Sequence, residues 1–87
     1  MIRDTIKLYG ERRDPGRNMA RFFALEITHD LLGGIRLERR WGRIGQHGRL
    51  AVDMYSNLKE AKSAMEVWRA RKFSNMSNAY IPKEDKR

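Results

Sequence analysis

The sequence predicts an α+β fold: a twisted antiparallel sheet of four or five strands, with one long helix packed on one face. Segments that alternate with period two fill the first part of the chain, short glycine-containing turns separate them, and one amphipathic segment of helical period follows. With 87 residues, the chain can form one domain with a thin core, because chains this short bury only roughly 60 to 65% of their unfolded surface. We expect a single domain over residues 1–87, with its core at about 5–81 and a frayed tail at 82–87.

The first two predicted strands are joined by a turn. Thr5–Gly10 alternates β-branched or apolar residues with polar ones and stops at glycine. Asp14-Pro15-Gly16 predicts the turn, because proline fixes φ and glycine permits a positive φ. The second strand is Met19–Asp30, with one parity that carries Phe23, Leu25 and Ile27.

A hairpin follows two glycines. Its first strand begins at Ile35 and places Ile35, Leu37, Arg39, Trp41 and Arg43 on one face, and Arg36, Glu38, Arg40 and Ile44 on the other. Gly45–Arg49 predicts the turn, and Leu50–Ser56 predicts the fourth strand, with Leu50, Val52 and Met54 on one side. One face of this hairpin remains ambiguous.

From Asn57 the period changes to that of a helix. One stripe carries the apolar residues Leu58, Ala61, Ala64, Met65 and Trp68, which we assign to the core. Ser56 or Asn57 can cap the first turn, and Asn57 with Glu60 has nearly the spacing of a capping box. Small polar residues end the helix before Tyr80-Ile81, Pro82 and the charged tail.

The charge balance favours a polyanionic partner. The chain has 19 Lys and Arg against 11 Asp and Glu, a formal net charge of +8, which fits DNA, RNA, the ribosome or an acidic lipid surface. The absence of cysteine excludes disulfides and thiolate metal sites, and two histidines are too few for a histidine-rich site. We therefore expect no metal and no cofactor. Charges scattered through the first residues argue against a signal peptide or a spanning helix, so we expect a cytoplasmic protein.

Trp41 lies within the cationic segment Glu38–Leu50, ERRWGRIGQHGRL. One interpretation is a core residue that buries up to roughly 250 Å² of indole. The other is an exposed platform, because Arg39, Arg40 and Arg43 are hard to desolvate together, whereas at a surface they can pair with phosphates while the indole stacks on sugar or base. We favour the platform.

The segment RRWGRIGQHGR, which contains Trp41-Gly42-Arg43, resembles the core motif of the WGR domain family. The segment DPGRNMARFFALEI is similar to the strand before the motif in small bacterial members, and the helix ending in RARKF follows at the expected distance. The resemblance covers roughly Arg12 to Tyr80. It implies an antiparallel sheet with a helix across one face, and it implies nucleic-acid binding, with DNA favoured over RNA.

Residue roles also follow from the resemblance. In the DNA-dependent poly(ADP-ribose) polymerases, the motif tryptophan packs on a terminal sugar at a strand break and neighbouring basic residues contact phosphates. This implies Trp41 as a stacking platform and Arg40 as a phosphate contact. The motif arginine there also passes the break signal to other domains, a role that Arg43 could retain only beside such a domain. The helix end departs from the lysine-rich pattern of those enzymes, with Asn75, Asn78 and Tyr80 instead, so specificity for breaks does not transfer.

Several candidates have alternative interpretations. Arg40 and Arg43 could pair with Glu38 or Asp53 across the sheet. Arg71 and Lys72 belong to a helix end, where cations are also favoured by the helix dipole. The glycines of the motif are best explained by hairpin geometry, which would let another backbone approach. The full set of candidate nucleic-acid-binding residues is Trp41, Arg40, Arg43, Arg39, Gln46, His47, Arg49, Arg17, Arg21, Arg71 and Lys72.

These observations favour a non-catalytic nucleic-acid-binding module. No nucleophile is identifiable beside His29 and Asp30, and no carboxylate pair suggests catalysis. The alternative is a protein-interaction module that acts as an accessory to a larger enzyme. Binding to a membrane surface is less favoured, because the apolar stripe of the helix is needed for the core.

Overall fold

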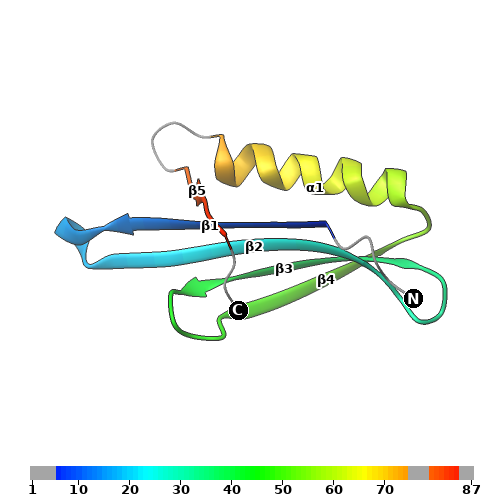
Figure 1. Ribbon diagram of the computed structural model, residues 1–87, viewed down its shortest axis with the longest axis horizontal. Coiled ribbons are helices and arrows are strands. Elements are labelled where there is room, and N and C mark those ends of the chain that lie inside the picture. The colour runs from blue at the N-terminus through cyan, green and yellow to red at the C-terminus, as the bar shows by residue number, and fades with distance from the viewer. Residues whose placement is uncertain (1–5, 75–78, 85–87) are drawn as a thin grey trace.

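A computed structural model describes residues 6–74 and 79–84, and it shows an antiparallel sheet with one helix across one face (Figure 1). The sheet is five-stranded, in the order β4-β3-β2-β1-β5. Its elements are β1 (Ile6–Asp14), the short 3-10 turn η1 (Pro15–Arg17), β2 (Met19–His29), β3 (Ile35–Arg43), β4 (Arg49–Tyr55), α1 (Leu58–Phe73) and β5 (Ile81–Pro82). The predicted α+β class is confirmed.

The first strand is longer than the sequence predicted. It does not stop at Gly10 but continues to Asp14, pairing in register with β2 from Ile6↔Ile27 to Asp14↔Met19. Gly10 is buried within the strand, where the ring of Phe73 lies over it and leaves no room for a side chain. This glycine therefore serves close packing rather than termination.

The C-terminal part of the described chain is held on two sides. The backbone N–H of Tyr80 donates to the carbonyl of Lys72, and that of Lys83 donates to the carbonyl of Tyr9, both at 2.8 Å. Strand β5 thus pairs with β1 at Ile81 and Pro82, and Pro82 is the first residue of the segment 82–87 where a frayed tail was expected. Asn75, Asn78 and residues 85–87 lie outside the described residues.

Helix α1 begins as predicted. The side chain of Asn57 accepts a hydrogen bond from the Glu60 backbone N–H at 2.8 Å, and the Ser56 hydroxyl donates to the Glu60 carboxylate at 3.0 Å. Ala61 is fully buried, and the rest of the apolar stripe packs against the core. The core between helix and sheet comprises Phe23, Leu25, Ile27, Ile35, Leu37, Ala61 and Tyr80.

The opposite face of the sheet has no helix over it, and we call it the open face. Register pairs place Arg36, Glu38 and Arg40 of β3 there, beside Met54, Val52 and Leu50 of β4. The apolar side of β4 is therefore exposed rather than directed to the helix. Sequence parity could group these residues but could not tell which face they take.

One aromatic side chain is buried on the open face. Phe22 is only 2% exposed, because it stacks on Tyr9 at a centroid distance of 6.0 Å and the turn after β3 folds over it. A Cβ built on Gly42 would lie 2.7 Å from the Cα of Gly48. The motif glycine thus permits a close approach of the backbone on either side of this turn.

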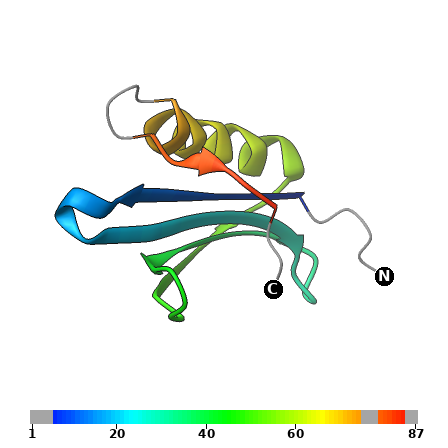
Figure 2. The same ribbon diagram turned by 60° about the vertical axis from the view of Figure 1, so that its left-hand side comes forward.

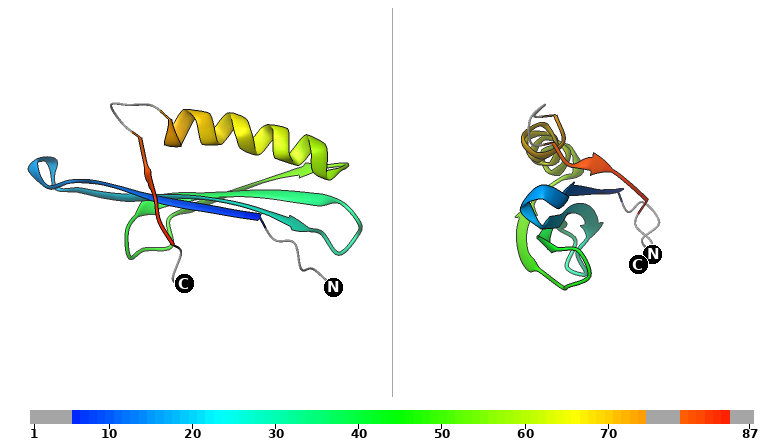
Figure 3. Two further views of the ribbon diagram at one scale, coloured as in Figure 1. Left: turned by 45° about the horizontal axis from the view of Figure 1, so that its top comes forward. Right: turned by 90° about the vertical axis from the view of Figure 1, so that its left-hand side faces the viewer.

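The sheet is longer than the helix that covers it. A helix of 16 residues spans about 24 Å, whereas a strand of 11 residues spans about 37 Å. The hairpin of β1 and β2 therefore projects past the C-terminal end of α1, as Figure 2 and the left view of Figure 3 show. Helix α1 does not cover the helix-facing side of this projecting part.

Candidate nucleic-acid interface

A cleft lies where α1 ends above the sheet, and we call it the basic cleft. Its volume is about 480 Å³, within the range of about 300–1,000 Å³ typical of ligand sites. Among residues 6–74 and 79–84, four cations, four apolar or aromatic residues and one tyrosine line it, and no carboxylate does. These residues are Arg12, Met19, Arg21, Phe23, Arg39, Trp41, Trp68, Lys72 and Tyr80. An anionic ligand with a flat apolar part fits this combination.

Stacked aromatic rings form the floor of the basic cleft. Phe23 and Trp41 are register partners on β2 and β3, and their ring centroids lie 6.5 Å apart. Trp68 of α1 also stacks on Phe23, at a centroid distance of 6.1 Å. Trp41 is partly buried against the core and also lines the cleft. One part of the Trp41 ring thus packs against the core, as the core interpretation expects, and another part is accessible from the cleft, as the platform interpretation expects.

Arg39 places a positive charge against these rings. Its guanidinium carbon lies 4.3 Å from the centroid of Trp68 and 5.8 Å from that of Trp41. One guanidinium nitrogen lies 3.6 Å from the Asp53 carboxylate, while its buried Nε has no hydrogen-bond partner in the described part of the chain. The charge is therefore only partly neutralised at the floor of the cleft.

Three arginines form a row across three strands. Arg12 of β1 lies opposite Arg21 of β2, and Arg21 lies opposite Arg43 of β3. Directly opposed residues point to the same face of a sheet, so the three guanidinium groups share the helix-facing side beyond the end of α1. We call these residues the arginine row. Two of its members line the basic cleft.

The other predicted residues surround this region at different distances. Arg49 is the register partner of Trp41 on β4, and the guanidinium of Arg71 lies 5.2 Å from the ring of Trp68. Lys72 lines the cleft itself. These three side chains extend the cationic rim around the tryptophans.

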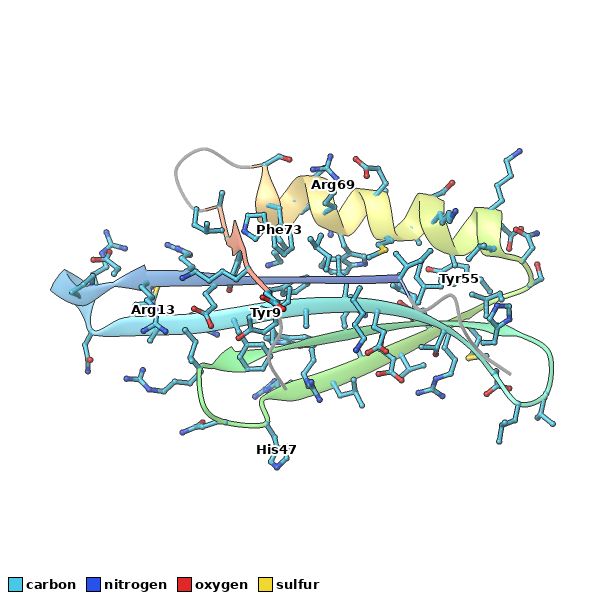
Figure 4. All side chains as sticks on the ribbon, viewed as in Figure 1. Tyr9, Arg13, His47, Tyr55, Arg69 and Phe73 are labelled. Carbon is cyan, nitrogen blue, oxygen red and sulfur yellow. The ribbon has the colours of Figure 1, made fainter. Side chains whose placement is uncertain are left out.

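Other candidates lie at the hairpin tips. Arg17 is exposed in η1, 3.6 Å from Asp14. Gln46 and His47 are exposed in the turn between β3 and β4, and Figure 4 shows His47 projecting away from the helix. Neither turn residue lines the basic cleft.

Arg40 is not brought together with Trp41. Alternation along β3 places it on the open face, where it lines a separate small pocket of about 40 Å³ beside Tyr9, Glu26 and Glu38. Its Nε is buried without a hydrogen-bond partner among the described residues. A ligand that occupies the basic cleft is therefore separated from Arg40 by the sheet.

Glu38 and Asp53, which the sequence offered as partners for Arg40 and Arg43, pair with other arginines. Glu38 accepts from Arg36 at 2.7 Å, and Asp53 pairs with Arg39. Within residues 6–74 and 79–84, Arg43 has neither an ion pair nor a side-chain hydrogen bond.

On the outer surface of α1, a hydrogen bond from Arg69 lowers the pKa of the Glu66 carboxyl. In that exposed pair the interaction also raises the pKa of Arg69.

Five residues of the cleft were not among the predicted site residues: Arg12, Met19, Phe23, Trp68 and Tyr80. Met19 and Phe23 were predicted as part of the second strand, without a role in the site. Arg12 was assigned to a loop because Gly10 was interpreted as a strand end, and the four charged residues Glu11–Asp14 show no alternation that reveals their pairing with β2. Trp68 was assigned to the core alone, and Tyr80 was noted only as a departure from the polymerases. Both pack against Phe23 and line the cleft, which only the tertiary structure reveals.

The fold and the cleft together define a small α+β binding module. The described residues contain no cluster of His, Cys, Asp and Glu suited to a metal ion, and no helix among them is long and apolar enough to cross a membrane. Residues 6–87 match the WGR domain, and the chain belongs to this family. The family is linked to nucleic-acid binding in proteins related to poly(ADP-ribose) polymerases.

A curated relative shows the same segment within a longer chain. The uncharacterized protein y4dW of Sinorhizobium fredii (strain NBRC 101917 / NGR234) is 46% identical over 61 residues, which cover 70% of this chain and 30% of that protein. The chain therefore spans less than a third of that relative.

Proposed function

We propose that this protein binds nucleic acid, with DNA as the preferred form, and that the basic cleft is the binding site. The observation that carries the proposal is the composition of the cleft: four cations and two tryptophans line it, and no carboxylate of the described residues does. Cations attract the phosphate backbone, and aromatic faces accept a sugar or base of any sequence. Trp41 is the proposed stacking platform.

The cationic side chains around the two tryptophans support the same proposal. Arg39, Arg49 and Lys72 lie around the tryptophans on the helix-facing side, and guanidinium groups can bind phosphate in bidentate geometry. DNA is proposed ahead of RNA because the related polymerases bind DNA. No step of chemistry is assigned to the cleft, so the proposal is one of binding without catalysis.

Fluorescence anisotropy tests this proposal. Labelled single-stranded, blunt-ended, nicked and circular DNA, and an RNA of the same length, are titrated with the protein at two ionic strengths. We expect binding that weakens as salt rises, because phosphate contacts release counterions. Binding to none of these ligands at low salt would exclude the proposal.

Substitution of Trp41 tests the platform itself. Trp41→Ala removes the ring, so we expect the dissociation constant to rise about 5- to 150-fold, which corresponds to about 1–3 kcal/mol of stacking. Leu50→Ala is the matched control, because it truncates a side chain that is 56% exposed on the open face. Circular dichroism checks folding, and a Trp41→Ala protein that does not fold would identify the ring as core only.

A protein partner is the second candidate. The open face exposes Leu50, Val52 and Met54 on one edge strand, and exposed apolar groups of this kind occur at protein interfaces. Binding through them would survive high salt, in contrast to binding through the basic cleft. A capture experiment in about 1 M salt, where charges are screened within about 3 Å, distinguishes these two modes of binding. A protein partner held by the open face would remain bound, whereas a ligand held by the basic cleft would be released.

A further inference from the structure

We propose that the arginine row is a track for the phosphates of an unpaired strand, which crosses the sheet at right angles to β1, β2 and β3 and turns its sugars and bases into the basic cleft. This inference rests on the proposed function and adds to it the form of the ligand, the direction of binding and a role for Arg12. The juxtaposition that carries it is Arg12, Arg21 and Arg43 in one register row beside Trp41.

The spacing of the row suits a nucleic-acid backbone. Neighbouring strands lie about 4.8 Å apart, so three arginines on three strands extend over about 10 Å, and alternate residues of one strand lie about 6.8 Å apart. Arg43 and Trp41 are alternate residues of β3. The row of charges and the row of aromatic rings thus run side by side, as the phosphates and bases of one strand do.

Electrostatics favour an anion on this row. Like charges on directly opposed residues destabilise a sheet; Arg21 lies directly opposite Arg43, which has no ion pair within residues 6–74 and 79–84. Arg12 and Arg21 pair on the part of the β1–β2 hairpin two residues beyond Gly10 and Phe23, where Phe73 packs on β1, and Arg43 lies beside them on β3. A bound phosphate would lower the repulsion between the directly opposed Arg21 and Arg43.

The cleft favours an unpaired strand over a duplex. Trp41 lies in a cleft of about 480 Å³ between the sheet and the end of α1, and a base held inside a duplex cannot reach a ring placed there. An unpaired nucleotide can enter, because its base is free to stack. Single-stranded DNA, single-stranded RNA and an overhang share this chemistry.

The test compares two double variants of equal charge. Arg12→Gln with Arg21→Gln removes two members of the row and keeps the motif residue Arg43. Lys7→Gln with Arg13→Gln removes two cations that β1 places on the open face. Binding of oligothymidylate and oligouridylate to each protein is measured by anisotropy over a range of salt concentrations.

We expect the row variant to reduce the slope of log K against log salt by about 1.4, since each phosphate contact to a single strand contributes about 0.7. The control should change it by much less. A slope that falls equally in both variants would overturn the track while leaving the proposed function intact. Wild-type protein that binds no oligonucleotide would overturn both.

A competition experiment tests the form of the ligand. Oligothymidylate bound to the wild-type protein is challenged with unlabelled oligothymidylate, oligouridylate or covalently closed circular duplex at equal phosphate concentration. We expect the two single strands to compete and the closed duplex to compete poorly. Competition by the closed duplex that matches the single strands would exclude a track for unpaired nucleotides.

Discussion

The helix-facing side of the sheet has two ends that share three strands but differ in every other respect. At the sealed end, Leu25, Ile27 and Leu37 are each no more than 1% exposed beneath α1. At the basic end, the same strands carry the arginine row and Trp41. Along β3 the helix-facing side changes from buried and apolar at Leu37 to exposed and cationic at Arg43.

This contrast shows how a thin core can coexist with a charged site. A small domain has little apolar surface to bury, so the helix covers only the part of the sheet that stabilises the fold. The remaining part of the β1–β2 hairpin is supported by backbone pairing along β1 and β2, which does not require apolar side chains. Figure 3, viewed along the long axis, shows the helix on one side of a curved sheet.

The largest effect should come from the sealed end. Leu37→Ala removes a side chain that is 0% exposed, and we expect the free energy of unfolding to fall by about 2–5 kcal/mol. Urea denaturation measures it. Leu50→Ala on the open face should change stability by less than about 0.5 kcal/mol, and equal losses in the two variants would contradict the division into a buried and an exposed face.

The border between the two ends can be tested at Gly10. A Cβ on this residue would meet the ring of Phe73 and lie 3.0 Å from the Ile81 carbonyl oxygen, so Gly10→Ala should reduce stability by about 1–3 kcal/mol through overpacking. Because Phe73 contacts Tyr80, which lines the basic cleft, the same variant should also weaken nucleic-acid binding.

Gly16→Ala is the control for this substitution. A Cβ there meets only the Asp14 carboxylate, at 3.5 Å, so we expect stability within about 0.5 kcal/mol of the wild type. A Gly10→Ala protein as stable as Gly16→Ala would show that Phe73 does not pack on β1 as described. Figure 4 shows Phe73 between the helix and the sheet, and Tyr9 on the opposite side of β1.

Much of the sealed end could be predicted from sequence. The parity of Phe23, Leu25 and Ile27, the apolar stripe of α1 and the cap at Asn57 are local patterns, and local patterns determine strand faces and helix starts. The match to the WGR domain over residues 6–87 confirms the family that the motif around Trp41 indicated.

The basic end was predicted less completely, because it depends on pairing between distant segments. Whether Gly10 ends a strand or continues it depends on Phe73, which lies far along the chain. Alternation along β3 separates Arg40 from Trp41, yet the resemblance placed both at one ligand. Because Trp41 packs against the core beneath the helix, Arg40 lies on the open face. A role for Arg40 in phosphate binding stays a prediction. Parity within a strand fixes relative faces, whereas the position of the helix fixes which face is buried.

The smallest expected effect distinguishes the two faces by its sign. Arg21→Gln removes the central charge of the arginine row, so it should raise the free energy of unfolding by about 0.2–1 kcal/mol at low salt, because opposed like charges destabilise a sheet. Arg36→Gln on the open face removes a charge that pairs with Glu38 at 2.7 Å, so it should lower stability, by about 0–1 kcal/mol. Both effects should shrink as the Debye length falls from about 30 Å at 0.01 M to about 3 Å at 1 M salt. Urea denaturation at these two concentrations measures them. A loss of stability in Arg21→Gln at low salt would mean that the arginine row is stabilised within the protein and has no need of an anion.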